Sequence, residues 1–157
     1  MTTPAPPPSR PDLPSVLGAF ARPDDESLLG GGVLAQHATA GARTAVVTTP
    51  RAPDGPRAAE FAAAPAVLGA DEPRMPGYSD ARNESSAPGQ PRWRDVNVED
   101  AVAQLVGHIR RFRPVVVAHD VLGQFTGHPD HRRTHQVALL AVEAAGVPHL
   151  HPAAGGP

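Results

Sequence analysis

Two short stretches of the chain combine carboxylates and histidines in a way that suits hydrolytic chemistry. The first reads RPDDESLLGGG and carries the adjacent carboxylates Asp24 and Asp25; the second reads GHPDHRRTH and carries His128 and His131. Histidine is a common zinc ligand, and carboxylates complete many hydrolytic sites. Because the chain has no cysteine, a metal held by such residues would be of the catalytic type, with one position left open for water.

The paired carboxylates also have a simpler interpretation. Asp24 and Asp25 precede a helix-like pattern, and acidic residues in the first turn of a helix are stabilised by its macrodipole. Alone they would be capping residues, but the second polar stretch favours chemistry. Four other histidines are expected to be surface or packing residues: His37, His108, His149 and His151. His119 ends an expected strand and could serve as a substitute ligand.

Apolar runs alternate with helical patterns along the chain. Strands are expected at residues 16–20, 43–49, 73–78, 114–120 and 148–151. Helices are expected at residues 25–41, 56–70, 97–112 and 131–146, with a long loop at 79–96. Strands that alternate with helices form right-handed units, so the expected fold class is α/β, a three-layer sandwich with a mostly parallel sheet.

Both polar stretches follow expected strands, at the edge where parallel α/β sheets bind ligands. Asp24 and Asp25 come directly after the first strand. His119 and Asp120 end the strand expected at 114–120, and the loop with His128 comes next. We therefore expect all these groups to meet at one rim of the sheet.

Charge and composition argue against several classes of partner. The 157 residues carry 14 basic and 16 acidic side chains, so nothing indicates a nucleic acid or an anionic membrane. No apolar run approaches the ~20 residues that span a bilayer, and the first residues lack the order of a signal peptide. A cytoplasmic protein is expected. Residues 1–14 are rich in proline and are expected to form a disordered tail before one domain at 15–157.

Taken together, the two stretches give the chain a family resemblance. It resembles the LmbE-like family, the GlcNAc-phosphatidylinositol de-N-acetylases or PIG-L family, through RPDDESLLGGG and GHPDHRRTHQVALLAVEAAG. The resemblance continues through AGARTAVVTT, RAAEFAAAPAVLGA and PRMPGYSDAR. It implies a Rossmann-like fold and a zinc-dependent hydrolase that removes an N-acetyl group from a small amino-sugar substrate. The chain ends at Pro157, earlier than many members, so part of the family's C-terminal structure is expected to be absent.

The resemblance also implies roles for single residues at the metal. Asp25 and His131 correspond to zinc ligands of the family. Asp24 corresponds to the general base that takes a proton from the attacking water. A carboxylate beside the metal is a competent base, and a metal-coordinated water can reach a pKa near ~7.

Further roles concern the substrate. His128 corresponds to the group that stabilises the tetrahedral oxyanion or protonates the leaving amine, and Asp130 would orient it. Arg57 and Asp80 correspond to positions that contact sugar hydroxyls in relatives. These assignments follow from the resemblance alone.

Arg22 departs from the family pattern, because it stands where the first zinc-binding histidine is expected. A guanidinium is always charged and has no free lone pair, so it cannot ligate zinc. Zinc binding is therefore expected to be weak or absent, with Arg22 pairing with Asp24 or Asp25 in place of the metal. Two functions stay open: a zinc-dependent deacetylase, or a metal-free, catalytically silent member that binds a sugar or a partner protein.

Deletion of residues 1–14 should leave the thermal midpoint of unfolding nearly unchanged, because a proline-rich segment contributes few groups to a core. Thermal melts of the full and the shortened chain measure the effect. A midpoint that falls by many degrees would show that this segment packs on the domain.

Overall fold

A parallel sheet lies at the centre of the protein. The computed structural model describes residues 13–48, 63–70, 77–120 and 126–147. Its sheet has the strand order β2-β1-β3, formed by β1 (Val16–Phe20), β2 (Thr44–Thr48) and β3 (Val116–His119). β1 pairs in parallel with both neighbours, so that Val16 lies opposite Thr44 on one side and Val116 on the other. The β-branched run at 114–120 favours a strand in the middle of a sheet. Among the described strands, however, β1 is the middle one and β3 lies beside it.

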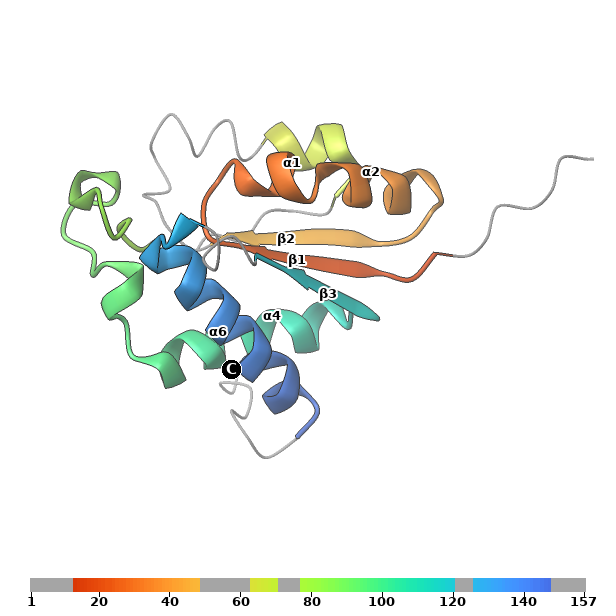
Figure 1. Ribbon diagram of the computed structural model, residues 1–157. Helices are drawn as coiled ribbons and strands as arrows, with labels where there is room; N and C mark the ends of the chain where they lie inside the picture. Colours follow the sequence, from red (N-terminus) through yellow and green to blue (C-terminus); the bar gives the residue numbers. More distant parts are fainter. Residues whose placement is uncertain (1–12, 49–62, 71–76, 121–125, 148–157) are drawn as a thin grey trace, which may run out of the picture.

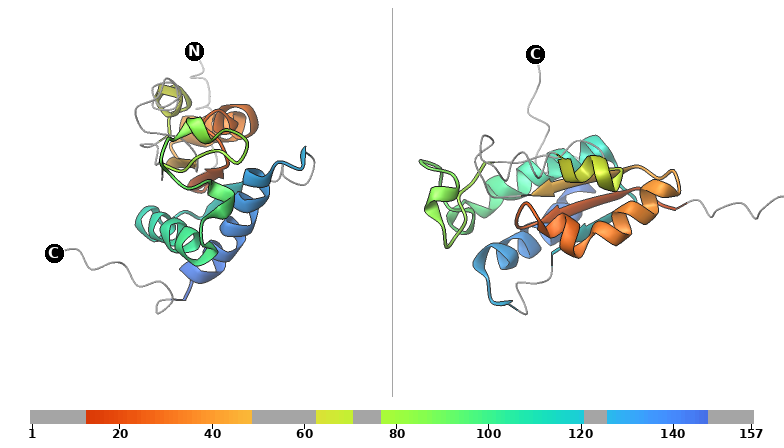
Figure 2. Two further views of the ribbon diagram at one scale, coloured as in Figure 1. Left: turned by 90° about the vertical axis from the view of Figure 1, so that its left-hand side faces the viewer. Right: turned by 90° about the horizontal axis from the view of Figure 1, so that it is seen from above.

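Helices cover both faces of this sheet (Figures 1 and 2). One face carries α1 (Asp25–Leu29), α2 (Gly31–Thr39) and a short helix at residues 63–68. The opposite face carries α4 (Val98–Phe112) and α6 (Pro129–Ala145). The predicted α/β fold, a three-layer sandwich with a parallel sheet, is confirmed. Among the described helices, none has the length and apolar character needed to cross a membrane.

β1 is buried along its whole length because helices pack on both of its faces. Leu17 and Ala19 belong to the core formed with α4 and α6, whereas Val16 and Phe20 pack with Leu34 of α2. This alternation is the period of two that every strand has. Burial on both faces explains why β1 reads as a continuous apolar run in the sequence.

The single helix predicted for residues 25–41 is instead two helices, which divide at Gly30. The helix and the sheet pack closely at this glycine. A Cβ atom added to Gly30 would lie 2.5 Å from Cζ of Phe20, and one added to Gly18 would lie 2.5 Å from Cε2 of the same ring. The buried Phe20 ring is therefore wedged between two glycines. Gly32 has no atom within 4 Å of an added Cβ and needs another explanation.

Several predicted segments lie partly or wholly outside the described residues. The strand expected at 148–151 is outside them, and residues 78–80 form only isolated bridges where the strand at 73–78 ends. The helix expected at 56–70 is described only from residue 63. At the start of the domain, Nδ1 of His37 lies 2.7 Å from the carbonyl oxygen of Pro14, so the chain contacts α2 just before β1.

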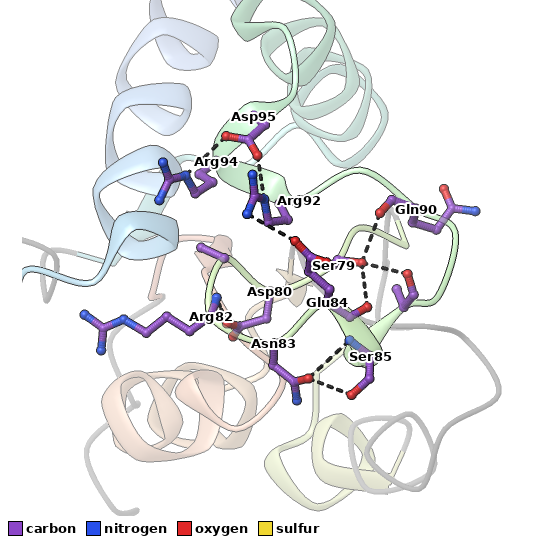
Figure 3. Close-up of polar contacts among 12 residues, drawn as sticks. Ser79, Asp80, Arg82, Asn83, Glu84, Ser85, Gln90, Arg92, Arg94 and Asp95 are labelled. Atoms are coloured by element: carbon purple, nitrogen blue, oxygen red, sulfur yellow. Dashed lines mark hydrogen bonds and ion pairs between the residues drawn. The ribbon is translucent and has the colours of Figure 1, made fainter.

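The predicted long loop at 79–96 is ordered by its own polar contacts (Figure 3). The Ser79 hydroxyl lies 2.6 Å from the carbonyl oxygen of Ala87 and 3.1 Å from that of Gln90. Arg92 donates from Nε to the Asp95 carboxylate at 2.6 Å. These contacts fold the loop back on itself at the carboxyl ends of the strands, which lie to the left in Figure 1.

Trp93 fastens this loop to the domain. Its side chain is buried, and its indole N–H donates to the hydroxyl of Thr134 in α6 at 3.1 Å. The ring also lies beside Tyr78, with 5.2 Å between the centroids. Trp93 thus anchors the loop that carries Asp80 to the rest of the domain.

Replacement of Gly30 by Ala should lower the free energy of unfolding by about 1–3 kcal/mol, the usual effect of overpacking a filled core. The Phe20 ring cannot move aside without approaching Gly18. Gly32→Ala is the matched control and should be neutral or stabilising by up to ~1 kcal/mol, since alanine favours helix. Urea unfolding of both variants measures the difference, and equal stabilities would contradict the wedge.

Candidate functional site

The polar residues of the two stretches meet at one rim of the sheet. Asp24 and Asp25 follow β1, Asp120 follows β3, and His128 and His131 begin α6. The rim lies at the carboxyl ends of the strands, where the sequence predicts it (Figure 1). The expected convergence of both motifs is therefore present.

The turn between β1 and α1 holds Asp24 in an unusual conformation. Its φ of 139° is one that non-glycine residues rarely adopt. The buried Glu26 braces this turn, because its carboxylate accepts the Asp24 N–H at 2.9 Å and the Ser27 hydroxyl at 2.8 Å. The Asp24 side chain makes no capping hydrogen bond to α1, so the simple capping interpretation is not supported. Backbone strain of this kind is common at functional sites.

Asp25, Asp120 and His131 form the first cluster of the site. Nδ1 of His131 is hydrogen-bonded to the Asp120 carboxylate and lies 3.9 Å from Oδ2 of Asp25. The possible ligand atoms of the three residues all lie within 4.8 Å of one another, and all three residues are buried. Oδ2 of Asp25 accepts no hydrogen bond from any described residue. The cluster therefore has the composition and spacing of a metal site.

Burial changes the protonation of this cluster. It raises the pKa of the Asp25 carboxyl to about 6, an effect that the neighbouring His131 partly opposes. The hydrogen bond to Asp120 raises the pKa of His131. Both groups thus hold protons more strongly than in water, and a metal would have to displace those protons.

Asp80, His128 and Asp130 form the second cluster, and all three are buried. Nδ1 of His128 accepts the backbone N–H of Asp130 at 3.2 Å, while Nε2 lies 3.9 Å from Oδ1 of Asp80. Burial lowers the pKa of His128. A neutral ring whose Nδ1 is an acceptor carries its proton on Nε2, so His128 is fixed as a hydrogen-bond donor toward the site.

The Asp130 carboxylate itself points elsewhere. Its Oδ2 accepts the N–H of Ala81 at 2.9 Å, and its Oδ1 accepts no hydrogen bond from the described residues. Burial raises the pKa of Asp130 to about 6. The expected orientation of His128 by Asp130 therefore runs through the backbone amide, and the carboxylate ties α6 to the loop with Asp80.

Arg22 lies beside the second cluster. Its Nη2 is 4.0 Å from the Asp24 carboxylate and its Nε is 4.0 Å from the Asp80 carboxylate. Of the two pairings that the sequence suggests, the one with Asp24 is present, whereas within the described chain Arg22 makes no ion pair with Asp25. The pairing with Asp80 is an addition of the tertiary structure, because the two residues are far apart in sequence.

Two further residues were expected at the site from the sequence, Arg57 and His119. Arg57 lies outside the described residues. His119 does not join the first cluster, because its Nδ1 faces Nδ1 of His135 in α6 at 3.4 Å. Asp120, the residue after His119, completes the first cluster with Asp25 and His131, although the sequence alone assigned it no role there. Its position at the end of an expected strand is the sequence feature that points to it.

Comparisons with known proteins agree with this geometry. A family model described as PIG-L, GlcNAc-PI de-N-acetylase, matches residues 17–142. The 1D-myo-inositol 2-acetamido-2-deoxy-alpha-D-glucopyranoside deacetylase of Mycobacterium sp. (strain KMS) is 35% identical over 159 residues, which cover 85% of this chain and 51% of the relative. The protein of the same name from Mycolicibacterium gilvum is 34% identical, with 85% and 56% covered. The chain thus spans about half the length of the curated relatives it matches.

Solved structures show the same fold. The N,N'-diacetylchitobiose deacetylase from Pyrococcus horikoshii matches with a TM-score of 0.70 at 21% identity, covering 87% of this chain and 52% of that one. A conserved protein from Thermus thermophilus also matches with a TM-score of 0.70, at 27% identity, covering 88% and 59%.

Replacement of Asp130 by Asn should stabilise the metal-free protein at neutral pH. The folded state raises this pKa from 3.8 to about 6, so stability from protonated Asp130 is present below pH 3.8 and lost as the pH rises through 6. Asn imitates the protonated form, so the variant should gain up to about 3 kcal/mol near pH 7.5 and nothing near pH 4. Urea unfolding with a chelator at both pH values measures this, with the exposed Glu143→Gln as control. A gain that is equal at both pH values would contradict the assignment.

Proposed function

Because the chain belongs to the PIG-L family of GlcNAc-PI de-N-acetylases, we propose that it hydrolyses the N-acetyl group of a small amino-sugar substrate. The activity for which the mycobacterial relatives are named, deacetylation of a 2-acetamido-2-deoxy-glucopyranoside, supports this class of substrate. The products would be acetate and the free amine. We also propose that the reaction uses zinc and that residues of both clusters take part in it.

One observation carries the proposal. The carboxylates after β1 and the histidines at the start of α6 face one another at the same rim, with Oδ2 of Asp25 3.9 Å from Nδ1 of His131. The rings of His131 and His128 are also neighbours, with 5.2 Å between their centroids. A metal ligand pair and a hydrogen-bond donor are therefore close enough to act on one substrate group.

The residues present fit a divalent cation. Asp25 offers a buried carboxylate oxygen that no described residue satisfies with a hydrogen bond, and His131 offers a ring nitrogen beside it. Buried carboxylates of this kind need a compensating positive charge. Asp25 and His131 would hold the metal, whose Lewis acidity makes hydroxide available from water near neutral pH.

Asp24 is proposed as the general base. Its side chain is 29% exposed, so it can reach a water molecule in the open part of the site. It would accept the proton of the attacking water and later deliver that proton to the nitrogen of the breaking C–N bond. Arg22, at 4.0 Å, provides a positive charge beside this carboxylate.

His128 is proposed to stabilise the oxyanion. Of the two roles open from the sequence, protonation of the leaving amine needs an imidazolium, and burial lowers the pKa of this ring. A neutral His128 with its proton on Nε2 can still donate a hydrogen bond to the developing oxyanion. The Asp130 N–H, which donates to Nδ1, keeps the ring in that tautomer.

Asp80 and Arg57 are proposed to contact the sugar. Asp80 is buried beside His128 and Arg22, so it borders the place where the acetamido group would lie. The role of Arg57 in binding the sugar rests only on the family resemblance. The alternative of a metal-free, silent family member is not favoured, because Arg22 pairs with Asp24 and Asp80 and leaves the Asp25–His131 pair open to a cation.

Replacement of Asp24 by Asn should lower the rate of deacetylation by about 10²–10⁴-fold, the usual contribution of a general base. The bound metal should be unchanged, because Asp24 is not part of the Asp25–His131 pair. Release of amine from N-acetylglucosamine glycosides, measured with an amine-reactive fluorophore in the presence of Zn²⁺, gives the rate. Metal content is measured on the same samples.

The control for this experiment is Glu143→Gln, an exposed carboxylate of α6 outside the site. It should match the native rate. A native protein that binds no zinc and releases no amine from any glycoside of this class would argue for the metal-free, silent alternative. An Asp24→Asn variant with the native rate would show that another group is the base.

A further inference from the structure

The family pattern calls for three protein ligands, and Arg22 cannot be one of them. The structure brings a different donor to the same place. We propose that Asp120 is the third protein ligand of the metal, so that this chain holds its cation with Asp25, Asp120 and His131. The inference rests on the proposed function in that it concerns the metal of the same site.

The backbone explains how Asp120 reaches the site. The N–H of Asp120 donates to the carbonyl of Ala19 at 3.2 Å, which extends the β1–β3 ladder by one residue. Asp120 therefore lies beside the end of β1, where the chain leaves for Asp25. His119 faces His135, and the next side chain, Asp120, faces His131.

The geometry of the three donors suits a small cation. Their ligand atoms lie within 4.8 Å of one another, and the Asp25–His131 pair is 3.9 Å apart. Donors around a tetrahedral zinc ion, with bonds of about 2.0–2.2 Å, lie about 3.3–3.6 Å apart. To form such a shell, donor separations would shorten by up to about 1.2 Å, and the hydrogen-bonded His131–Asp120 pair would open.

Burial supplies a second, independent observation. The Asp25 side chain is 9% exposed, and its Oδ2 accepts no hydrogen bond from the described residues although it faces His131 and Asp120. The Asp120 side chain is fully buried. Two carboxylates enclosed this closely repel each other unless a cation lies between them. Arg22 acts on Asp25 only at longer range, since its ion pairs within the described chain are with Asp24 and Asp80.

Asp120 could instead only orient His131, as outer carboxylates do at many metal sites. In that arrangement the carboxylate contacts one ring nitrogen and the metal takes the other. Here Nδ1 of His131 faces both Asp120 and Asp25. A cation that replaces the proton on Nδ1 would contact all three residues, which favours direct ligation.

This donor set changes the expected metal preference. Two carboxylates and one imidazole are a harder set than one carboxylate and two imidazoles, and harder donors suit Mn²⁺ relatively better. The ratio of Zn²⁺ to Mn²⁺ affinity should therefore be lower in the native chain than in an Arg22→His variant, which regains a second histidine.

A double-mutant cycle separates ligation from orientation. Native protein, Asp120→Asn, Arg22→His and the double variant are titrated with Zn²⁺ and Mn²⁺ against a chelating indicator, without substrate. Asn still accepts a hydrogen bond from His131, so it keeps the orientation but is a poor ligand. Asp120→Asn should lower the metal affinity of the native chain by more than the ~10–100-fold that loss of an orienting residue causes. In the Arg22→His background, where a histidine completes the set of ligands, Asp120→Asn should lower the metal affinity by less than ~10-fold.

Equal losses of metal affinity in the native chain and in the Arg22→His variant would overturn the proposal. Such a result would mean that Asp120 only orients His131, because that orientation is needed equally in both proteins. Unchanged affinity in Asp120→Asn would also overturn it, as would a native chain that binds neither ion. X-ray absorption at the zinc edge should count one imidazole in the native protein and two in Arg22→His. A count of two in the native protein would assign the third position to another histidine and exclude Asp120.

A control uses an exposed carboxylate of the same helix. Glu143→Gln lies outside the site and outside the proposed donor set, so it should leave the metal affinity unchanged. Thermal midpoints in a chelator show whether each variant folds. Since no step of the experiment uses turnover, absence of deacetylation would contradict the proposed function and leave the ligand assignment standing.

Discussion

Four carboxylates buried at one rim of the sheet are the constraint on which the site depends. Asp25, Asp80, Asp120 and Asp130 are each at most 6% exposed, and removal of such charges from water is unfavourable unless they are paired or protonated. The chain compensates with several partners: Arg22, two histidines and backbone N–H groups. Burial nevertheless raises the pKa of Asp25 and of Asp130 to about 6, so the compensation of these two carboxyls is incomplete.

The sheet creates this constraint through its topology. β1 lies between β2 and β3, and parallel pairing ends β1 and β3 side by side. The segments that leave them, toward α1 and α6, must then share one rim. The loop at 79–96 closes the rim from outside, and the Trp93–Thr134 hydrogen bond fixes it to α6. Short strands and one anchored loop thus bring together residues that are far apart in sequence.

Arg22 shows how a change at a motif position can move charge without removing a site. The guanidinium turns to Asp24 and Asp80, where two carboxylates already need a partner. Its positive charge lies on the side of Asp24 and of the cluster formed by Asp80, His128 and Asp130. The carboxylate that contacts His131 comes from the residue after β3, a different strand from the one before Asp25. A site at the meeting point of several elements can therefore draw its polar groups from more than one of them.

The sequence by itself determined the α/β class, the helices α4 and α6, and the rim on which Asp24, Asp25, His128 and His131 meet. These follow from apolar periodicity and from the rule that parallel strands end together, which are local or topological properties. Only the tertiary structure decided that the helix after β1 divides at Gly30 and that this glycine lies against the Phe20 ring of the sheet. It also decided that Arg22 pairs with Asp80 and that Asp120, not His119, faces His131. These choices depend on which side chains share an enclosed space, and one-dimensional spacing does not contain that information.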